Sequence, residues 1–169
     1  GSMALAWQNL DQPENAIASY HRALALAPEN PELLKGLGIV ELWRGDFRAG
    51  WRHYDSRLEC RDFPRRDFTS RRWSGESLGG ARLLVHAEQG FGDTLQFCRY
   101  LRLLAERPDA GEIIFECQRP LLDLMRSLDG RHTLVARGDP LPVVDSHVAL
   151  MSLPRHFDTV AETIPARIP

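Results

Sequence analysis

The spacing of the hydrophobic residues changes along the chain. In the first third, apolar residues recur at helical spacing, whereas beyond Trp73-Ser74-Gly75 they gather in short runs. The runs at 81–88, 112–118, 132–137 and 146–152 predict strands, and the segments 93–107 and 119–129 predict helices. Strands that alternate with helices pair in parallel through right-handed crossovers. We therefore predict an α + α/β fold, with helices first and a small parallel-sheet lobe over 81–169.

The helical part contains an internal sequence repeat. Shifting the sequence by 34 positions places 11–24 over 45–58. The matched pairs include Tyr20 with Tyr54, Leu24 with Leu58, and Ala16 with Gly50. Helices that cross closely require small residues at the crossing point. The 34-residue repeat, with small residues at matching positions, therefore predicts stacked helical repeats.

These residues resemble the tetratricopeptide repeat. The first copy matches the second half of the motif at Ala16, Tyr20, Ala23 and Pro28, and the second copy matches it at Leu34, Leu37, Gly38, Gly50 and Tyr54. Arg57 and Asp62 depart from the pattern, which indicates the end of a series. The resemblance implies about one and a half repeats within 1–60, truncated at the start.

Such repeats bind a protein or peptide in a groove lined by their first helices. The resemblance places Glu32, Lys35 and Ile39 in this groove; alternatively, these residues are solvated or pack against neighbours. Because about three stacked units are usually needed for stability, the open repeat edge must pack on something else. The downstream lobe, further repeats or a second copy of the chain would serve, so a homo-oligomer through that edge is one expectation.

Residues 61–80 form a predicted arginine-rich linker. Mixed charges surround Phe63, Phe68 and Trp73, and Pro64 interrupts any helix. A phosphate-binding patch is one interpretation. The other, which we favour, is a connector that packs its aromatic rings and arginine stems on its neighbours.

The turn after the first predicted strand carries the candidate chemistry. Open α/β folds bind ligands at the carboxyl edge of the sheet, where this turn is predicted to lie. Gly90 and Gly92 permit positive φ and close approach of a ligand, and the helix start offers free N–H groups to an anion, phosphate or sugar hydroxyl. The predicted ligand-binding residues are Glu88, Gln89, Gly90, Gly92 and Thr94. The stretch is neither a complete dinucleotide-binding fingerprint nor a P-loop.

The runs 71–104, 113–128 and 143–154 resemble the N-terminal lobe of bacterial tetratricopeptide-repeat proteins with a glycosyltransferase-like domain. This lobe is distantly similar to heptosyltransferases and, by architecture, to protein O-GlcNAc transferases. The resemblance implies the Rossmann-like N-terminal lobe of a GT-B-type fold. It also implies that Asp93 is the catalytic base that activates the acceptor, and that a second lobe, in the full-length protein only, holds the nucleotide-sugar donor.

Three functional hypotheses stay open. On the enzyme reading, 1–169 is an acceptor-side fragment that is inactive by itself without the second lobe. The alternative is a non-catalytic interaction scaffold whose α/β lobe is degenerate, and a third reading is a stand-alone nucleotide-binding module.

A structural role is the alternative explanation for an aspartate at position 93. An Asp at a helix start followed three residues later by Gln96 is a capping-box pattern, which predicts that Asp93 caps the helix.

Composition narrows the class of partner. The net charge is −2 and the pI about 6.3, which gives no general reason to expect nucleic acid. No apolar run is long enough for a membrane span and the N-terminus shows no basic-then-apolar signal pattern, so we expect a cytoplasmic protein. The family resemblance implies that it is bacterial. The three cysteines are expected to be reduced thiols. No cofactor is predicted, and no metal site either, because His86, His147 and His156 lack ligand spacing.

Overall fold

The computed structural model describes residues 12–128 and 132–166. They form two compact units. The helical unit comprises the described residues up to Arg65 together with Asp158–Ile164. The α/β unit comprises Arg66–Phe157 and the described residues from Pro165. Each unit is built from its own core.

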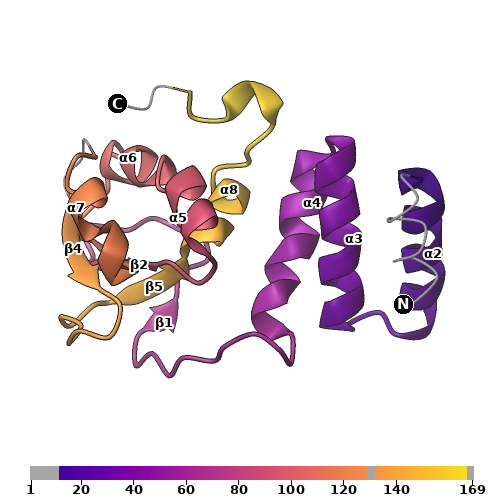
Figure 1. Cartoon of the computed structure of the whole chain (residues 1–169), viewed down its shortest axis with the longest axis horizontal. Coiled ribbons are helices and arrows are strands. Elements are labelled where there is room, and N and C mark those ends of the chain that lie inside the picture. The colour runs from indigo at the N-terminus through magenta and orange to yellow at the C-terminus, as the bar shows by residue number, and fades with distance from the viewer. Residues whose placement is uncertain (1–11, 129–131, 167–169) are drawn as a thin grey trace. The chain divides into compact units, whose positions relative to one another are not determined.

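The helical unit contains three successive α-helices (Figure 1). They are α2 (Pro13–Leu26), α3 (Pro31–Arg44) and α4 (Phe47–Tyr54), and the 3-10 turn η1 (Asp55–Glu59) continues α4. The Asn30 side chain caps α3 by accepting from the Leu33 N–H at 3.0 Å. Gly45 ends α3 in the left-handed region at φ 91°, where glycine avoids the Cβ penalty.

Glycines set the spacing of the helices in this unit. A Cβ on Gly38 of α3 would lie 2.4 Å from the Tyr54 backbone nitrogen, and one on Gly50 of α4 would lie 2.8 Å from the Leu42 nitrogen. Ala16 of α2 is fully buried. The predicted close packing at these small residues is therefore confirmed.

The chain returns to the helical unit after the α/β unit. Arg48 of α4 donates through Nε to both carboxylate oxygens of Asp158, at 3.1 and 3.0 Å. The short 3-10 helix η4 (Ala161–Thr163) follows in the same segment.

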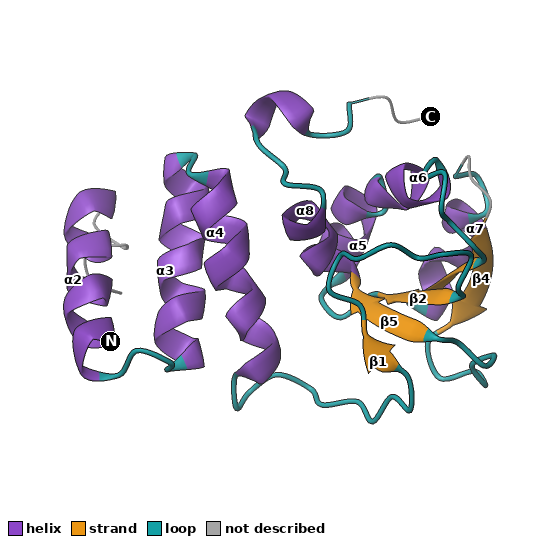
Figure 2. Ribbon diagram, turned by 180° about the vertical axis from the view of Figure 1, so that it is seen from behind, coloured by secondary structure: helices purple, strands orange, loops and turns teal. Residues whose placement is uncertain are grey.

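The α/β unit is built on a five-stranded parallel sheet, as Figure 2 shows. Its strands are β1 (Arg71–Arg72), β2 (Leu83–His86), β3 (Ile113–Cys117), β4 (His132–Ala136) and β5 (Ser146–Ala149), in the order β1-β5-β2-β3-β4. In register, β2 residue Leu83 pairs with Ile113 of β3 and with Ser146 of β5. The coarse prediction of helices joined to a parallel α/β sheet is confirmed.

Several predicted element bounds need correction. The predicted helix 93–107 is two helices, α5 (Phe91–Phe97) and α6 (Tyr100–Ala105), because the backbone tightens between them into a Leu101 N–H to Cys98 carbonyl bond. The helix predicted at 119–129 is the 3-10 turn η2 (Arg119–Leu121) plus one turn, α7 (Leu122–Met125). The last predicted strand ends at Ala149, before η3 (Leu150–Ser152) and α8 (Leu153–His156).

The predicted linker 61–80 contains structure that its composition did not reveal. Its arginines Arg71 and Arg72 form β1, which pairs with β5. Trp73 is 1% exposed and belongs to the main core of the α/β unit. Its indole N–H donates to the Glu76 carbonyl at 3.0 Å, so the buried ring has its polar atom satisfied.

The two faces of the sheet are covered differently. Val85, Phe115 and Cys117 point into the core that α5, α6 and α7 cover. Because strand side chains alternate, His86 and Glu116 point to the opposite face, where the irregular segment 66–70 contacts them. One face of the sheet is thus apolar and covered by helices, and the other, which we call the polar face, carries His86 and Glu116 beside the buried Leu84 and Ile114.

Candidate functional site

The strand order reverses direction beside β2. From β2 the chain proceeds outward to β3 and β4, and then β5 pairs with the other side of β2. Ligands of open α/β sheets bind outside the carboxyl ends of strands at such a switch point. The turn 87–90 leaves the carboxyl end of β2 there and enters α5.

Gln118 holds this turn in place. It directly follows β3, is 9% exposed, and donates through Nε2 to the Gln89 carbonyl at 2.9 Å. Its Oε1 accepts from the Thr94 hydroxyl at 3.0 Å. Thr94, a predicted ligand-binding residue, is itself 1% exposed, so its hydroxyl serves to join α5 to β3. Sequence reasoning missed Gln118, although a polar residue at the carboxyl end of a buried strand is a usable signal.

The two glycines of the turn do not use their conformational freedom. Gly90 has φ −72°, and Gly92 is not among the glycines with positive φ. Neither glycine therefore adopts the positive φ that its lack of a side chain permits. A Cβ on Gly92 would meet nothing within 4 Å, and one on Gly90 would only touch the Asp93 carboxylate at 3.5 Å. Neither backbone conformation nor packing within the chain requires glycine here, and the space beside Gly92 is open.

Asp93 lies three positions later in its helix than predicted, at the third helical position and not at the N-cap. Helix α5 begins at Phe91 with Gly90 as its N-cap, so Asp93 is the third helical residue. Its Oδ2 accepts from the Gly90 N–H at 3.1 Å, which is the reach-back half of a capping box. The predicted partnership with Gln96 is wrong, because Asp93 itself takes the position assigned to that residue. Asp93 is half-buried, and Glu88 and Gln89 are likewise partly exposed.

A second polar cluster lies on the opposite face of the sheet. Glu116 of β3, 1% exposed, pairs with both terminal nitrogens of Arg66. The Phe68 ring packs against both His86 of β2 and His147 of β5. Sequence spacing gave no sign that these histidines converge, because parallel pairing joins residues that are far apart in the chain. In the part of the chain that the structure describes, no group of three His, Cys, Asp or Glu residues is placed to hold a metal ion.

The predicted peptide groove is partly occupied by its own chain. Glu32 accepts from the Arg61 backbone N–H at 3.3 Å, and Lys35 forms an ion pair with Asp62 at 3.6 Å. Ile39 is 38% exposed on α3, and one helical turn further Trp43 is 51% exposed. Trp43 was not predicted for this surface, although its spacing from Ile39 puts both on one face.

The cysteines are buried thiols. Cys60, Cys98 and Cys117 are free and buried. Burial, reinforced by the neighbouring Glu116 charge, raises the pKa of the Cys117 thiol to about 11. A thiol that stays protonated at neutral pH is a poor nucleophile, so Cys117 serves packing.

None of the helices that the structure describes has the length and apolar character needed to cross a membrane.

The chain is similar to Protein FlbA of Caulobacter vibrioides. The two are 34% identical over 109 residues, an alignment that covers 61% of this chain and 18% of FlbA. This chain therefore spans less than a fifth of that relative's length. No protein-family model and no solved structure matches the chain.

Proposed function

We propose that the α/β unit is the acceptor-side lobe of a glycosyltransferase-like protein, with the turn 88–94 as its acceptor site. The observation that carries the proposal is the open space beside Gly92 at the switch point of the sheet. Glycine in a helix costs about 0.5–1 kcal/mol relative to alanine. Since the chain's own structure gives no reason for that cost, close approach of a ligand to the backbone is the explanation we adopt.

Asp93 is the proposed acceptor-activating base. Sugar transfer to a hydroxyl needs a group that takes the acceptor proton, and a partly exposed carboxylate beside the open space has the right chemistry. Only its Oδ2 accepts from the Gly90 N–H, and a carboxylate has lone pairs on both oxygens. The capping bond also fixes the side chain's orientation. A nucleotide-sugar would be the donor, held by a further lobe of the full-length protein.

Substitution separates the two roles of Asp93. In the natural full-length protein, with radiolabelled nucleotide-sugars as donors, we expect Asp93→Asn to lose sugar transfer while its melting temperature stays nearly unchanged. Asparagine still accepts the Gly90 N–H but is no base. Asp93→Ala should lose both transfer and roughly 0.5–2 kcal/mol of stability.

Asp123→Asn on α7 is the matched control, since its side chain is 91% exposed and pairs with Arg126. Transfer retained by Asp93→Asn would show that Asp93 is only a cap.

A second candidate function is a protein-binding scaffold built on a tetratricopeptide-like helical unit. The exposed Ile39 and Trp43, one turn apart on α3, favour it, because contiguous apolar surface is typical of interaction sites. The partner would be a protein or peptide. Absence of transfer by the natural full-length protein, with any donor tested, would favour this scaffold over the enzyme.

A further inference from the structure

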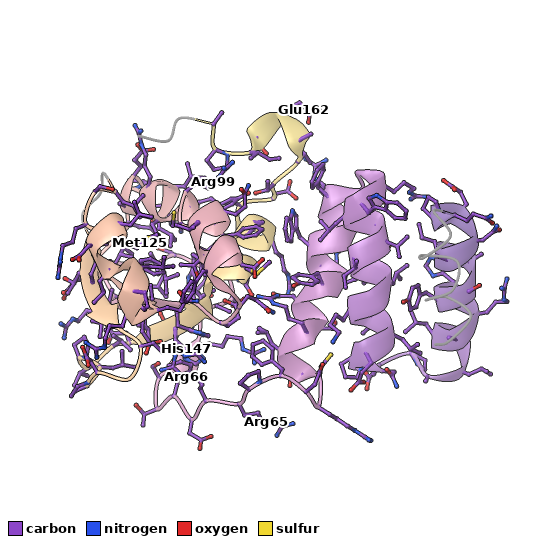
Figure 3. All side chains as sticks on the ribbon, viewed as in Figure 1. Arg65, Arg66, Arg99, Met125, His147 and Glu162 are labelled. Atoms are coloured by element: carbon purple, nitrogen blue, oxygen red, sulfur yellow. The ribbon has the colours of Figure 1, made fainter. Side chains whose placement is uncertain are left out.

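The segment Arg66–Ser70, which we name the strap, is an irregular stretch fastened to the polar face of the sheet. It directly follows Arg65, the residue at which the first segment of the helical unit ends. Arg66 anchors its start through the pair with Glu116, and Figure 3 shows Arg66 near His147. Ser70 anchors its end through a 3.1 Å hydrogen bond between its hydroxyl and His147 Nδ1.

Between these anchors, one aromatic ring joins the strap to two strands. The centroid of the Phe68 ring lies 4.3 Å from that of His147, in a stacked arrangement, and 4.8 Å from that of His86. The two imidazole rings are 5.9 Å apart. His86 is 6% exposed, and Phe68 is itself partly buried. The strap therefore closes on the sheet chiefly through an aromatic ring that packs on two neighbouring titratable rings.

Positive charge already surrounds this ring. The Arg66 guanidinium carbon lies 4.6 Å from the Phe68 centroid, which is a cation–π contact. Glu116 is the acid facing the cluster, and its carboxylate is already paired with Arg66. Burial lowers the pKa of His147, Ser70 acts in the opposite sense, and the charges of Arg72 and Arg66 lower it further. A protonated His147 would thus add a second cation beside the Phe68 ring, while the Glu116 carboxylate is already paired with Arg66.

We propose that the strap is an acid-released latch, in which protonation of His147 frees Phe68 from the polar face of the sheet. The open strap exposes both histidines to water, where their charged forms are solvated, so acid favours opening. Opening is reversed when the proton leaves. Release of Phe68 uncovers the imidazole of His86, on which the ring packs in the closed state.

The direction of the pH dependence follows from the difference in proton binding between the closed and the open strap. A histidine with a lowered pKa in the closed state binds its proton more readily when the strap is open, so closure is complete above about pH 6.5 and weakens as pH falls below it. Histidine is the side chain whose ordinary titration falls between about pH 5 and 8. The latch therefore responds within a range that leaves most carboxylates ionised.

A spin label on the strap tests the proposal. Thr69 is exposed and the three native cysteines are buried, so Thr69→Cys can be labelled selectively with a nitroxide. Electron paramagnetic resonance spectra are recorded from about pH 8 to about pH 5. We expect the immobilised component to dominate at the upper end and the mobile component to dominate at the lower end, with a reversible midpoint below the ordinary histidine value of about 6.5.

Two variants in the labelled background make the test specific. His147→Gln keeps a neutral polar side chain without a titrating proton, so its strap should stay immobilised at the lower pH. His21→Gln is the matched control, because His21 is exposed on α2 in the other unit, and it should retain the transition. Phe68→Ala should give the mobile spectrum at every pH.

Three results would overturn the latch. The first is a spectrum that does not change with pH, and the second is a transition that persists in His147→Gln. The third is loss of far-ultraviolet circular dichroism at the same midpoint, since the whole unit would then be unfolding rather than the strap.

Discussion

At the scale of single residues, glycines in this chain serve two opposite purposes. Gly38 and Gly50 are required by packing, since a Cβ at either would lie under 3 Å from backbone atoms of the neighbouring helix. Gly92 has open space where a side chain would go. The same residue type thus marks a helix crossing in one unit and, on our proposal, a ligand site in the other.

Alanine substitution separates these two purposes. Gly38→Ala should destabilise the protein by about 1–3 kcal/mol or more, because the Tyr54 backbone nitrogen cannot move aside as a flexible side chain would. Gly92→Ala should leave the free energy of unfolding unchanged or raise it by up to about 1 kcal/mol. Urea denaturation of both variants measures the difference. A loss in Gly92→Ala as large as that in Gly38→Ala would contradict the open-space argument.

At the scale of elements, the turn between β2 and α5 depends on a residue from a third element. Gln118, after β3, is at once donor to the Gln89 carbonyl and acceptor from the Thr94 hydroxyl. A carboxamide has both capacities in one planar group, and neither leucine nor glutamate has both at neutral pH.

We expect Gln118→Leu to cost about 1–3 kcal/mol, because it leaves the buried Thr94 hydroxyl and the Gln89 carbonyl without their partner. Amide hydrogen exchange should speed up selectively in residues 88–94. Gln96→Leu, an exposed change on α5 with no such bonds, should stay within about 0.5 kcal/mol of the parent. Equal exchange rates in the two variants would show that Gln118 does not hold the turn.

The limits of sequence-based prediction are clear at this scale. Strands β2 and β3 were predicted because they are buried on both faces and so read as apolar runs, Leu83–His86 and Ile113–Cys117. Strand β1 was missed because two exposed arginines carry no such signal. Asp93 was assigned to the wrong helical position because aspartate suits both the cap and the first turn, and the backbone alone decides between them.

In the candidate site, too, the contiguous residues were predicted and the distant ones were missed. The turn after β2 was found because its glycines and polar residues are contiguous, whereas the contribution of Gln118 is distant in sequence. The cluster around Phe68 was not predicted, because its members are also distant in sequence. They come from the predicted linker and from β2, β3 and β5. The spacing of apolar residues along the sequence predicts helices and strands. Contacts across parallel strands depend on the order of the strands in the sheet, which this spacing does not predict.

At the scale of the whole molecule, two separate segments of the chain belong to the helical unit. Asp158–Ile164 belongs to that unit although all of Arg66–Phe157 intervenes. Thr159 in this segment is 2% exposed, and the Arg48–Asp158 pair adds a two-point contact at the surface. The returning segment should therefore bind the helical unit even when the chain is cut before the α/β unit.

Co-expression of 1–65 and 66–169 as separate polypeptides tests this. The two should copurify and elute together in size-exclusion chromatography, because the second polypeptide carries the returning segment. A second polypeptide that ends at Phe157 should lose the association. Asp158→Ala should weaken it only slightly, since an exposed ion pair contributes about 0–1 kcal/mol. Separate elution of 1–65 and 66–169 would contradict the assignment of the segment.

The strand order also decides where this sheet can grow. An edge strand presents unpaired N–H and C=O groups that can recruit a strand from another molecule. On one side the edge is β1, only two residues long and bearing two exposed arginines, which disfavour aggregation by length and by charge. On the other side the edge is β4, with five residues available for pairing. Strand addition, whether by a binding peptide or in misassembly, is therefore directed to β4.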